Sequence, residues 1–212
     1  MTPTPAERDV PRGTRLPRQA RRKQLLGAAQ EVFVAQGYHA AAMDDIAERA
    51  GVSKPVLYQH FPGKLELYLA LLDEHAADLT RKVVAALQST TDNRLRVAAC
   101  VAAYFDFVDG DGEAFRLVFE SDLRNDPAVR ARVEKMTAEC VEAISETIAH
   151  DTGFGHEDSK LLAVGLTGMA EVGARWWLAA QVDGPGSVPK ERAVELLVGL
   201  SWRGISGAPL HG

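Results

Sequence analysis

Apolar residues recur every three or four positions along most of the chain, and this spacing restricts the fold more than any other feature of the sequence. In the segment 127–150, for example, Met136, Cys140 and Ile144 fall on one face of a helix. No segment alternates between apolar and polar residues as a half-buried strand does. The sequence therefore predicts an all-α fold.

Glycine, proline and polar breaks divide this pattern into about nine helices. Gly37 and Gly51 fall where the first two helices end, and Ser53 precedes the third helix as its N-cap. Pro55 lies in the first turn of the third helix, where its missing N–H has no helical partner. The predicted helices span 19–36, 43–50, 54–61, 64–87, 94–108, 113–123, 127–150, 158–182 and 190–203.

Charge is distributed unevenly along the 212 residues. Residues 1–64 hold ten Lys or Arg against six Asp or Glu, whereas the remainder holds 14 against 23. The net charge of −5 therefore conceals a basic N-terminal part. Such an arrangement suits a head that binds a polyanion, carried on a body that phosphate repels.

Cysteine content and hydropathy favour a reduced, cytoplasmic protein. Cys100 and Cys140 have no histidine or second cysteine pair at metal-ligand spacing, so we expect no metal and no cofactor. The N-terminus has Arg and Pro where a signal peptide needs an apolar run. The apolar stretch 161–182 contains Glu171 and Arg175, which are costly in lipid, so it is predicted as a buried helix and not a membrane span.

The segment 42–64 carries the functional prediction. Two short helices joined at Gly51 form a helix-turn-helix, whose second helix fits a DNA major groove about 12 Å wide. At 100° per residue, Leu57 and Phe61 share one side of that helix and are predicted to face the core. The opposite side is left for contacts with DNA.

That opposite side offers side chains that can read bases. Lys54 can donate to guanine O6 and N7, and Gln59 can pair with adenine through two hydrogen bonds. Lys64 begins the next helix, where an ammonium and N-terminal backbone N–H groups can bind a phosphate. The remaining predicted contacts are Pro55 and Val56 on thymine methyl groups, and Tyr58 and His60 on phosphates.

The run MDDIAERAGVSKPVLYQHFPGK at 43–64 resembles the DNA-binding signature of the tetracycline-repressor (TetR) family, and the resemblance covers about residues 18–78. It implies that Tyr58 and Phe61 are the aromatic positions of this signature and that Lys64 binds phosphate. It also implies base reading by Lys54, Pro55 and Gln59.

The chain departs from the family pattern just before its second helix. Ala41 and Ala42 stand where the family usually has Thr or Ser, so a hydroxyl cap and a phosphate contact are missing. Arg18, Arg21 and Arg22 are predicted to compensate by contacting the DNA backbone or a minor groove. The alternative for these arginines is a solvated tail.

One head of this size cannot read a whole operator, so a homodimer is predicted, and resemblance to the family places its interface in the C-terminal part. The sequence then divides into a flexible basic arm at 1–17, a DNA-binding domain at 18–78 and an effector-binding and dimerisation domain at 79–212. The last two long helices are the implied interface, and the alternative is that their apolar faces belong to the monomer core. The predicted interface residues are Leu162, Leu166, Met169, Val194, Leu197 and Leu200.

The family usually encloses an effector pocket among its middle helices. Aromatic side chains of the body can line such a cavity for a small apolar or amphipathic effector, and charged residues can supply polar contacts. The alternative for each is ordinary core packing, and Glu171 and Arg175, four residues apart, can simply pair. The predicted pocket residues are Tyr104, Phe107, Phe115, Phe119, Glu120, Glu171, Arg175 and Trp176.

These features together predict a ligand-responsive dimeric repressor that binds a palindromic operator in double-stranded DNA. One alternative is a DNA-binding regulator without a small-molecule effector, acting through protein contacts or as an activator. Another is a helical binding protein or enzyme that retains the head, although we find no catalytic motif. The acidic run 109–113 has glycine and glutamate at the wrong offsets for a calcium loop.

Overall fold

The computed structural model describes residues 16–110, 123, 125–182 and 188–203. All secondary structure in these residues is helical, which confirms the predicted fold class. The predicted helix at 113–123 lies almost entirely outside the described residues. The helices are α1 (Arg18–Ala40), α2 (Met43–Arg49), α3 (Lys54–His60), α4 (Lys64–Gln88), α5 (Asn93–Gly110), α7 (Pro127–Thr152), α8 (His156–Val182) and α9 (Lys190–Arg203).

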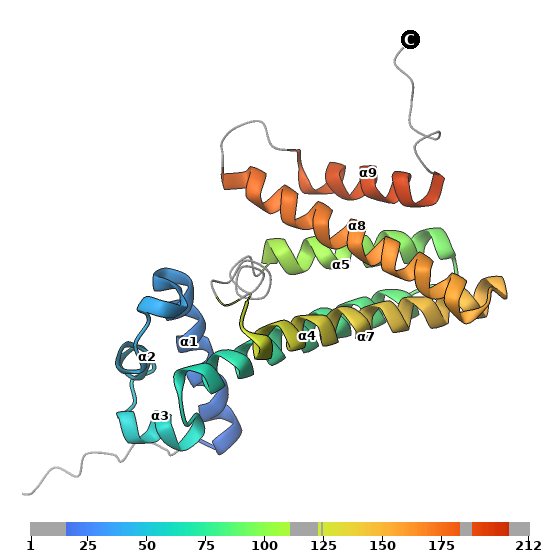
Figure 1. The fold of residues 1–212 in the computed structure, drawn as a ribbon. Coiled ribbons are helices and arrows are strands. Elements are labelled where there is room, and N and C mark those ends of the chain that lie inside the picture. The colour runs from blue at the N-terminus through green and yellow to red at the C-terminus, as the bar shows by residue number, and fades with distance from the viewer. Residues whose placement is uncertain (1–15, 111–122, 124, 183–187, 204–212) are drawn as a thin grey trace, which may run out of the picture.

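Helix α1 and the short helices α2 and α3 form a head at one end of the long helix α4 (Figure 1). Leu25 of α1, Ile46 of α2 and Leu57 of α3 are all fully buried, and Phe61 is 2% exposed. The inward orientation predicted for Leu57 and Phe61 is therefore confirmed. The hydrophobic effect of burying these side chains holds the three helices in one fixed arrangement.

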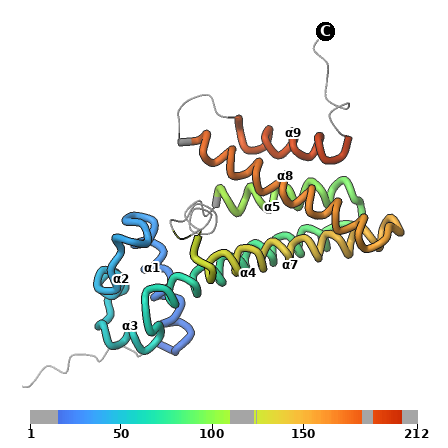
Figure 2. The backbone as a smooth tube through the Cα atoms, in the orientation of Figure 1, coloured from blue at the N-terminus to red at the C-terminus, as the bar shows by residue number. Residues whose placement is uncertain are grey.

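The body gathers around the distal part of α4. Helices α5 and α7 both pack on α4, α8 packs on α7 and α5, and α9 packs on α5 and α8. Figure 2 shows α4 running from the head into this bundle, with α8 and α9 on the side away from α4. None of the described helices is long and apolar enough to cross a membrane.

Local signals explain where several helices end. Gly37 has φ 76° and interrupts α1, and Gly153 ends α7 with φ 74°, conformations that glycine adopts without strain. The Asp126 carboxylate caps α7 by accepting hydrogen bonds from the N–H groups of Ala128 and Val129. The predicted cap of α3 is wrong in part, because Ser53 occupies the N-cap position without a side-chain hydrogen bond.

Candidate DNA-binding site and internal cavity

Helices α2 and α3 form a helix-turn-helix. Gly51 adopts φ 63° at the turn, and the Val52 N–H donates to the Ala47 carbonyl at 3.0 Å, which holds the turn against α2. As the sequence predicts, Ala42 precedes α2 without a side-chain cap. The turn leaves one side of α3 buried in the head and the other side in solvent.

The solvent side of α3 presents the residues predicted to read bases. Lys54, Pro55, Tyr58 and Gln59 are exposed, whereas Val56 and His60 are half-buried. The Lys54 ammonium lies 2.5 Å from the Asp44 carboxylate, and this hydrogen bond raises the pKa of Lys54. Because both partners are well exposed, the pair is weak, and Lys54 can leave it for DNA at little cost.

The three arginines of α1 lie beside the C-terminal end of α3. Desolvation, followed by the charges of Arg18, Arg22 and Arg21, lowers the pKa of His60. The Arg22 guanidinium lies 4.4 Å from the centre of the Phe61 ring. Arg22 therefore packs on the head, and the three arginines add positive charge beside the C-terminal end of α3.

Lys64 begins α4, as predicted, but its ammonium binds groups of the protein itself. Its ammonium donates to the carbonyls of Tyr38 and Ala41, both at 2.8 Å, and of His39 at 3.2 Å. It also lies 4.6 Å from the centre of the Tyr38 ring. Since an ammonium has three hydrogens, these carbonyls saturate it. Lys64 thus joins the end of α1 to the start of α4, and the predicted phosphate clamp does not match this geometry.

A helix-turn-helix whose second helix keeps one face exposed, carried on a helical body, is typical of a DNA-binding transcriptional regulator. The comparisons with known proteins agree. The model of the bacterial regulatory proteins of the tetR family matches residues 25–71. The HTH-type transcriptional activator FasR of Mycolicibacterium smegmatis is 50% identical over 199 residues, which cover 94% of this chain and 89% of FasR. This chain belongs to the TetR family.

Solved structures share its fold. A TetR-like regulator from Rhodococcus sp. RHA1 superimposes with a TM-score of 0.68 at 28% identity and covers 92% of this chain and 100% of its own. The regulator FadR from Bacillus subtilis, solved in complex with stearoyl-CoA, superimposes with a TM-score of 0.71 at 19% identity. That alignment covers 86% of this chain and 98% of FadR, and it supports the fold alone.

A partly open cavity of about 330 Å³ lies among α5, α7, α8 and the ends of α4 and α9. This volume is at the lower end of the range for small-molecule sites, about 300–1,000 Å³. Its lining is mainly apolar, and burial raises the pKa of the Cys100 thiol there to about 12. Thr167 also lines it, with a hydroxyl that is buried and has no hydrogen-bond partner among the described residues.

Only part of the predicted pocket coincides with this cavity. Tyr104 lines it. Phe107 is instead packed in the core near Lys82, and Glu171 and Arg175 are half-buried outside the lining. Trp176 is 63% exposed on the outer face of α8, so its assignment to the pocket is wrong. Phe115, Phe119 and Glu120 lie outside the described residues.

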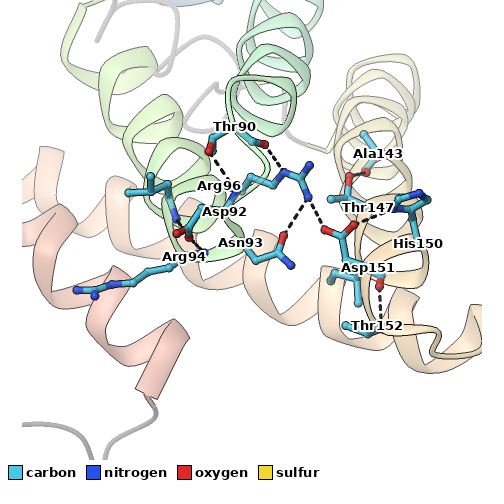
Figure 3. A network of polar contacts seen from close by, with 12 residues as sticks. Thr90, Asp92, Asn93, Arg94, Arg96, Ala143, Thr147, His150, Asp151 and Thr152 are labelled. Atoms are coloured by element: carbon cyan, nitrogen blue, oxygen red, sulfur yellow. Dashed lines mark hydrogen bonds and ion pairs between the residues drawn. The ribbon is translucent and has the colours of Figure 1, made fainter.

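Sequence reasoning missed the polar end of the cavity. Arg96 of α5 and Asp151 of α7 both line it and pair with each other (Figure 3). They are 55 positions apart in the sequence. No motif or helical spacing connects them, so only the tertiary fold reveals the pair.

The predicted dimer residues divide between two environments. Leu166 lines the cavity, the Met169 sulfur lies 3.9 Å from the Ser201 hydroxyl, and Leu197 packs directly on Gly173, all within one chain. Helix α9 covers this side of α8, so these predicted contacts are intramolecular in the structure. Val194 also packs against the core, whereas Leu162 and Leu200 are 46% and 43% exposed.

Another apolar face of α8 is open to solvent. Leu161, Val164, Val172 and Trp176 are between 51% and 73% exposed, and Gly165 is exposed between them. On α9, Leu196 is 49% exposed near Leu200. We call these exposed apolar residues of α8 and α9 the outer face.

Proposed function

We propose that the chain is a homodimeric, ligand-responsive transcriptional regulator that binds an inverted-repeat operator in the cytoplasm. Residues 18–78 serve as the DNA-binding domain and residues 79–212 as the effector-binding and dimerisation domain. One observation carries the proposal: the exposed face of α3 presents Lys54, Pro55, Tyr58 and Gln59 beside the arginine cluster of α1. Lys54 reads guanine and Gln59 reads adenine, while the arginines contact phosphates.

The outer face of α8 and α9 supports the homodimer. Large apolar side chains there are half-exposed or more in the single chain. Exposed apolar side chains of this kind are typical of an interaction site, and a second copy of the same face is self-complementary in a twofold dimer. Joining two bodies through this face provides the two heads that an inverted repeat requires.

The cavity supports response to a small apolar or amphipathic effector. Its lining is largely apolar, and the buried Thr167 hydroxyl can gain a hydrogen bond from a ligand. The stearoyl-CoA complex of the B. subtilis FadR structure is a precedent for a ligand with a long apolar chain in this fold.

The test is selection of bound duplexes from a random DNA pool, followed by affinity measurements on the selected site over a range of salt. We expect an inverted repeat and a steep fall of affinity with salt, because Lys and Arg release counterions from the phosphates. Weak binding without enrichment of any sequence would show that the head does not read an operator.

A second candidate function concerns the direction of regulation. The sequence predicts a repressor, but FasR, with half of its residues identical over most of both chains, is named an activator. We therefore include activation as the alternative. A reporter gene placed downstream of the selected site, with and without the protein, distinguishes the two: expression rises for an activator and falls for a repressor.

A further inference from the structure

The polar end of the cavity is built around one ion pair between Arg96 and Asp151. The Arg96 Nε donates to the Thr90 carbonyl at 2.7 Å, and Nη1 donates to the Asn93 Oδ1 at 3.0 Å and pairs with Asp151. The side chains of Arg96 and Asp151 are only 16% and 18% exposed. Figure 3 shows Arg96 between the α4–α5 turn and the last turns of α7, pointing toward Asp151.

Arg96 is the one cation and Asp151 the one carboxylate among the described residues that line the cavity. Most of the other lining side chains are apolar, and the remainder are uncharged. A charged pair at the edge of an apolar cavity is costly to desolvate and is stable only while each charge has a partner. A ligand with a charged head group can therefore exchange with one member of the pair.

We propose that the effector is an amphiphile with an apolar chain and an anionic head group, and that Arg96 recognises this head group by exchanging Asp151 for it. This inference rests on the proposed ligand-responsive function and specifies the chemistry of the ligand. The apolar chain occupies the cavity among α5, α7 and α8. Arg96 is the residue that determines specificity.

The surroundings of the two charges favour an anion over a cation. When Arg96 exchanges its partner, Thr90 and Asn93 still hold the guanidinium in place. Asp151 keeps a partner as well, since its Oδ1 lies 2.8 Å from Nδ1 of His150, a side chain that is 88% exposed. A cationic head group on Asp151 would instead leave the Arg96 charge with neutral acceptors alone, which is unfavourable for a largely buried cation.

Three probes of equal chain length test the proposal by calorimetry: decanoate, decan-1-ol and decylamine. We expect decanoate to bind about tenfold more tightly than decan-1-ol, as one charge-assisted hydrogen bond provides. Arg96→Gln should abolish that preference without changing the affinity for decan-1-ol. Asp151→Asn should tighten decanoate binding severalfold, because the competing carboxylate is gone.

Arg94→Gln is the matched control, since Arg94 is exposed, lies two residues away and does not line the cavity. It should bind all three probes like the unmodified protein. Retained binding of decan-1-ol shows that the Arg96→Gln protein is folded, and Asp151→Asn tests the exchange independently of that variant.

Each other outcome overturns the inference. If the unmodified protein binds decanoate and decan-1-ol equally, the ion pair has only a structural role. The same conclusion follows if Asp151→Asn binds decanoate more weakly than the unmodified protein does. In both cases the cavity still binds an effector. Tightest binding of decylamine assigns recognition to Asp151. Binding of none of the probes overturns the inference together with this cavity as an effector site, and operator binding, measured separately, shows whether the DNA-binding function survives.

Discussion

Lys64 illustrates how much the role of a residue depends on its neighbours. The family signature implies a phosphate contact, but three carbonyls at the end of α1 accept its hydrogens. The same ammonium therefore stabilises the connection between α1 and α4. The sequence can identify the position of this lysine but not its partners, because Tyr38 and Ala41 lie 26 and 23 residues earlier.

We predict that Lys64→Gln lowers the free energy of unfolding by about 2 kcal/mol, since it removes charge-assisted hydrogen bonds to carbonyls that are partly buried. The dependence of operator affinity on salt should keep the same slope. The matched variant Lys54→Gln should leave stability unchanged and reduce that slope by about one, as the loss of one DNA contact by a cation does. If Lys64→Gln instead reduced the salt slope and left stability unchanged, Lys64 would be a phosphate contact, as the family signature implies.

His60 should make operator binding depend on pH. Desolvation and the charges of Arg18, Arg22 and Arg21 lower its pKa in the free protein, so the imidazole is neutral at pH 7. A nearby phosphate favours the charged form, so binding takes up a proton and affinity rises as pH falls from about 7.5 to 6. Stability changes in the opposite direction: the folded state binds fewer protons than the unfolded state just below the ordinary histidine pKa, so lowering the pH destabilises it.

Operator affinity measured across that pH range, with unmodified protein and with His60→Gln, tests this prediction. The variant should lose the pH dependence and keep its affinity at pH 7.5. An unchanged slope in His60→Gln would assign the proton to another group and remove His60 from the set of phosphate contacts.

At the scale of helices, the sequence predicts most boundaries and fails where tertiary contacts decide. Helices α4 and α9 begin at Lys64 and Lys190 as predicted, because Pro62 and Gly63 precede the first and Pro189 precedes the second. The sequence does not predict which side of α8 faces the core. Apolar residues surround much of this helix, and the position of α9 determines which of them are covered.

The cap of α7 provides a prediction at this scale. The Asp126 carboxylate accepts hydrogen bonds from two N–H groups that have no helical partner. Asp126→Ala should therefore lower the free energy of unfolding by about 1 kcal/mol in denaturant titrations. Glu134→Ala, an exposed position of the same helix, is the control and should have almost no effect. Equal stability of both variants would show that α7 does not depend on its cap.

For the whole molecule, the outer face of α8 and α9 should determine the oligomeric state. Val172 is 51% exposed in the single chain, so Val172→Glu should leave the monomer folded and place a charge in the interface. We expect a monomer by sedimentation velocity and at least a tenfold loss of affinity for the full operator. Leu95→Glu, at a position 56% exposed on α5, should remain dimeric. A dimeric Val172→Glu protein would locate the interface elsewhere.

Helix α4 joins the two functions of the molecule. Lys64 at its start is bonded to the head, and Leu87, near its end, lines the cavity. Its 25 residues span about 37 Å as a continuous helix, so a displacement of Leu87 by a ligand can reorient the head. We predict that decanoate changes operator affinity by about 5- to 150-fold, the usual range of coupling between sites.

Glycines in the middle of α4 should break this coupling. The double variant Ala76→Gly and Ala77→Gly costs about 2 kcal/mol of stability but removes no contact with ligand or DNA. Each ligand should therefore bind alone with nearly unchanged affinity, while decanoate no longer alters operator binding. Ala131→Gly with Ala138→Gly on α7 carries a similar cost and should keep the coupling. If both double variants keep it, the signal reaches the heads by another route, and the interface of α8 and α9 becomes the element to test, because both heads depend on it.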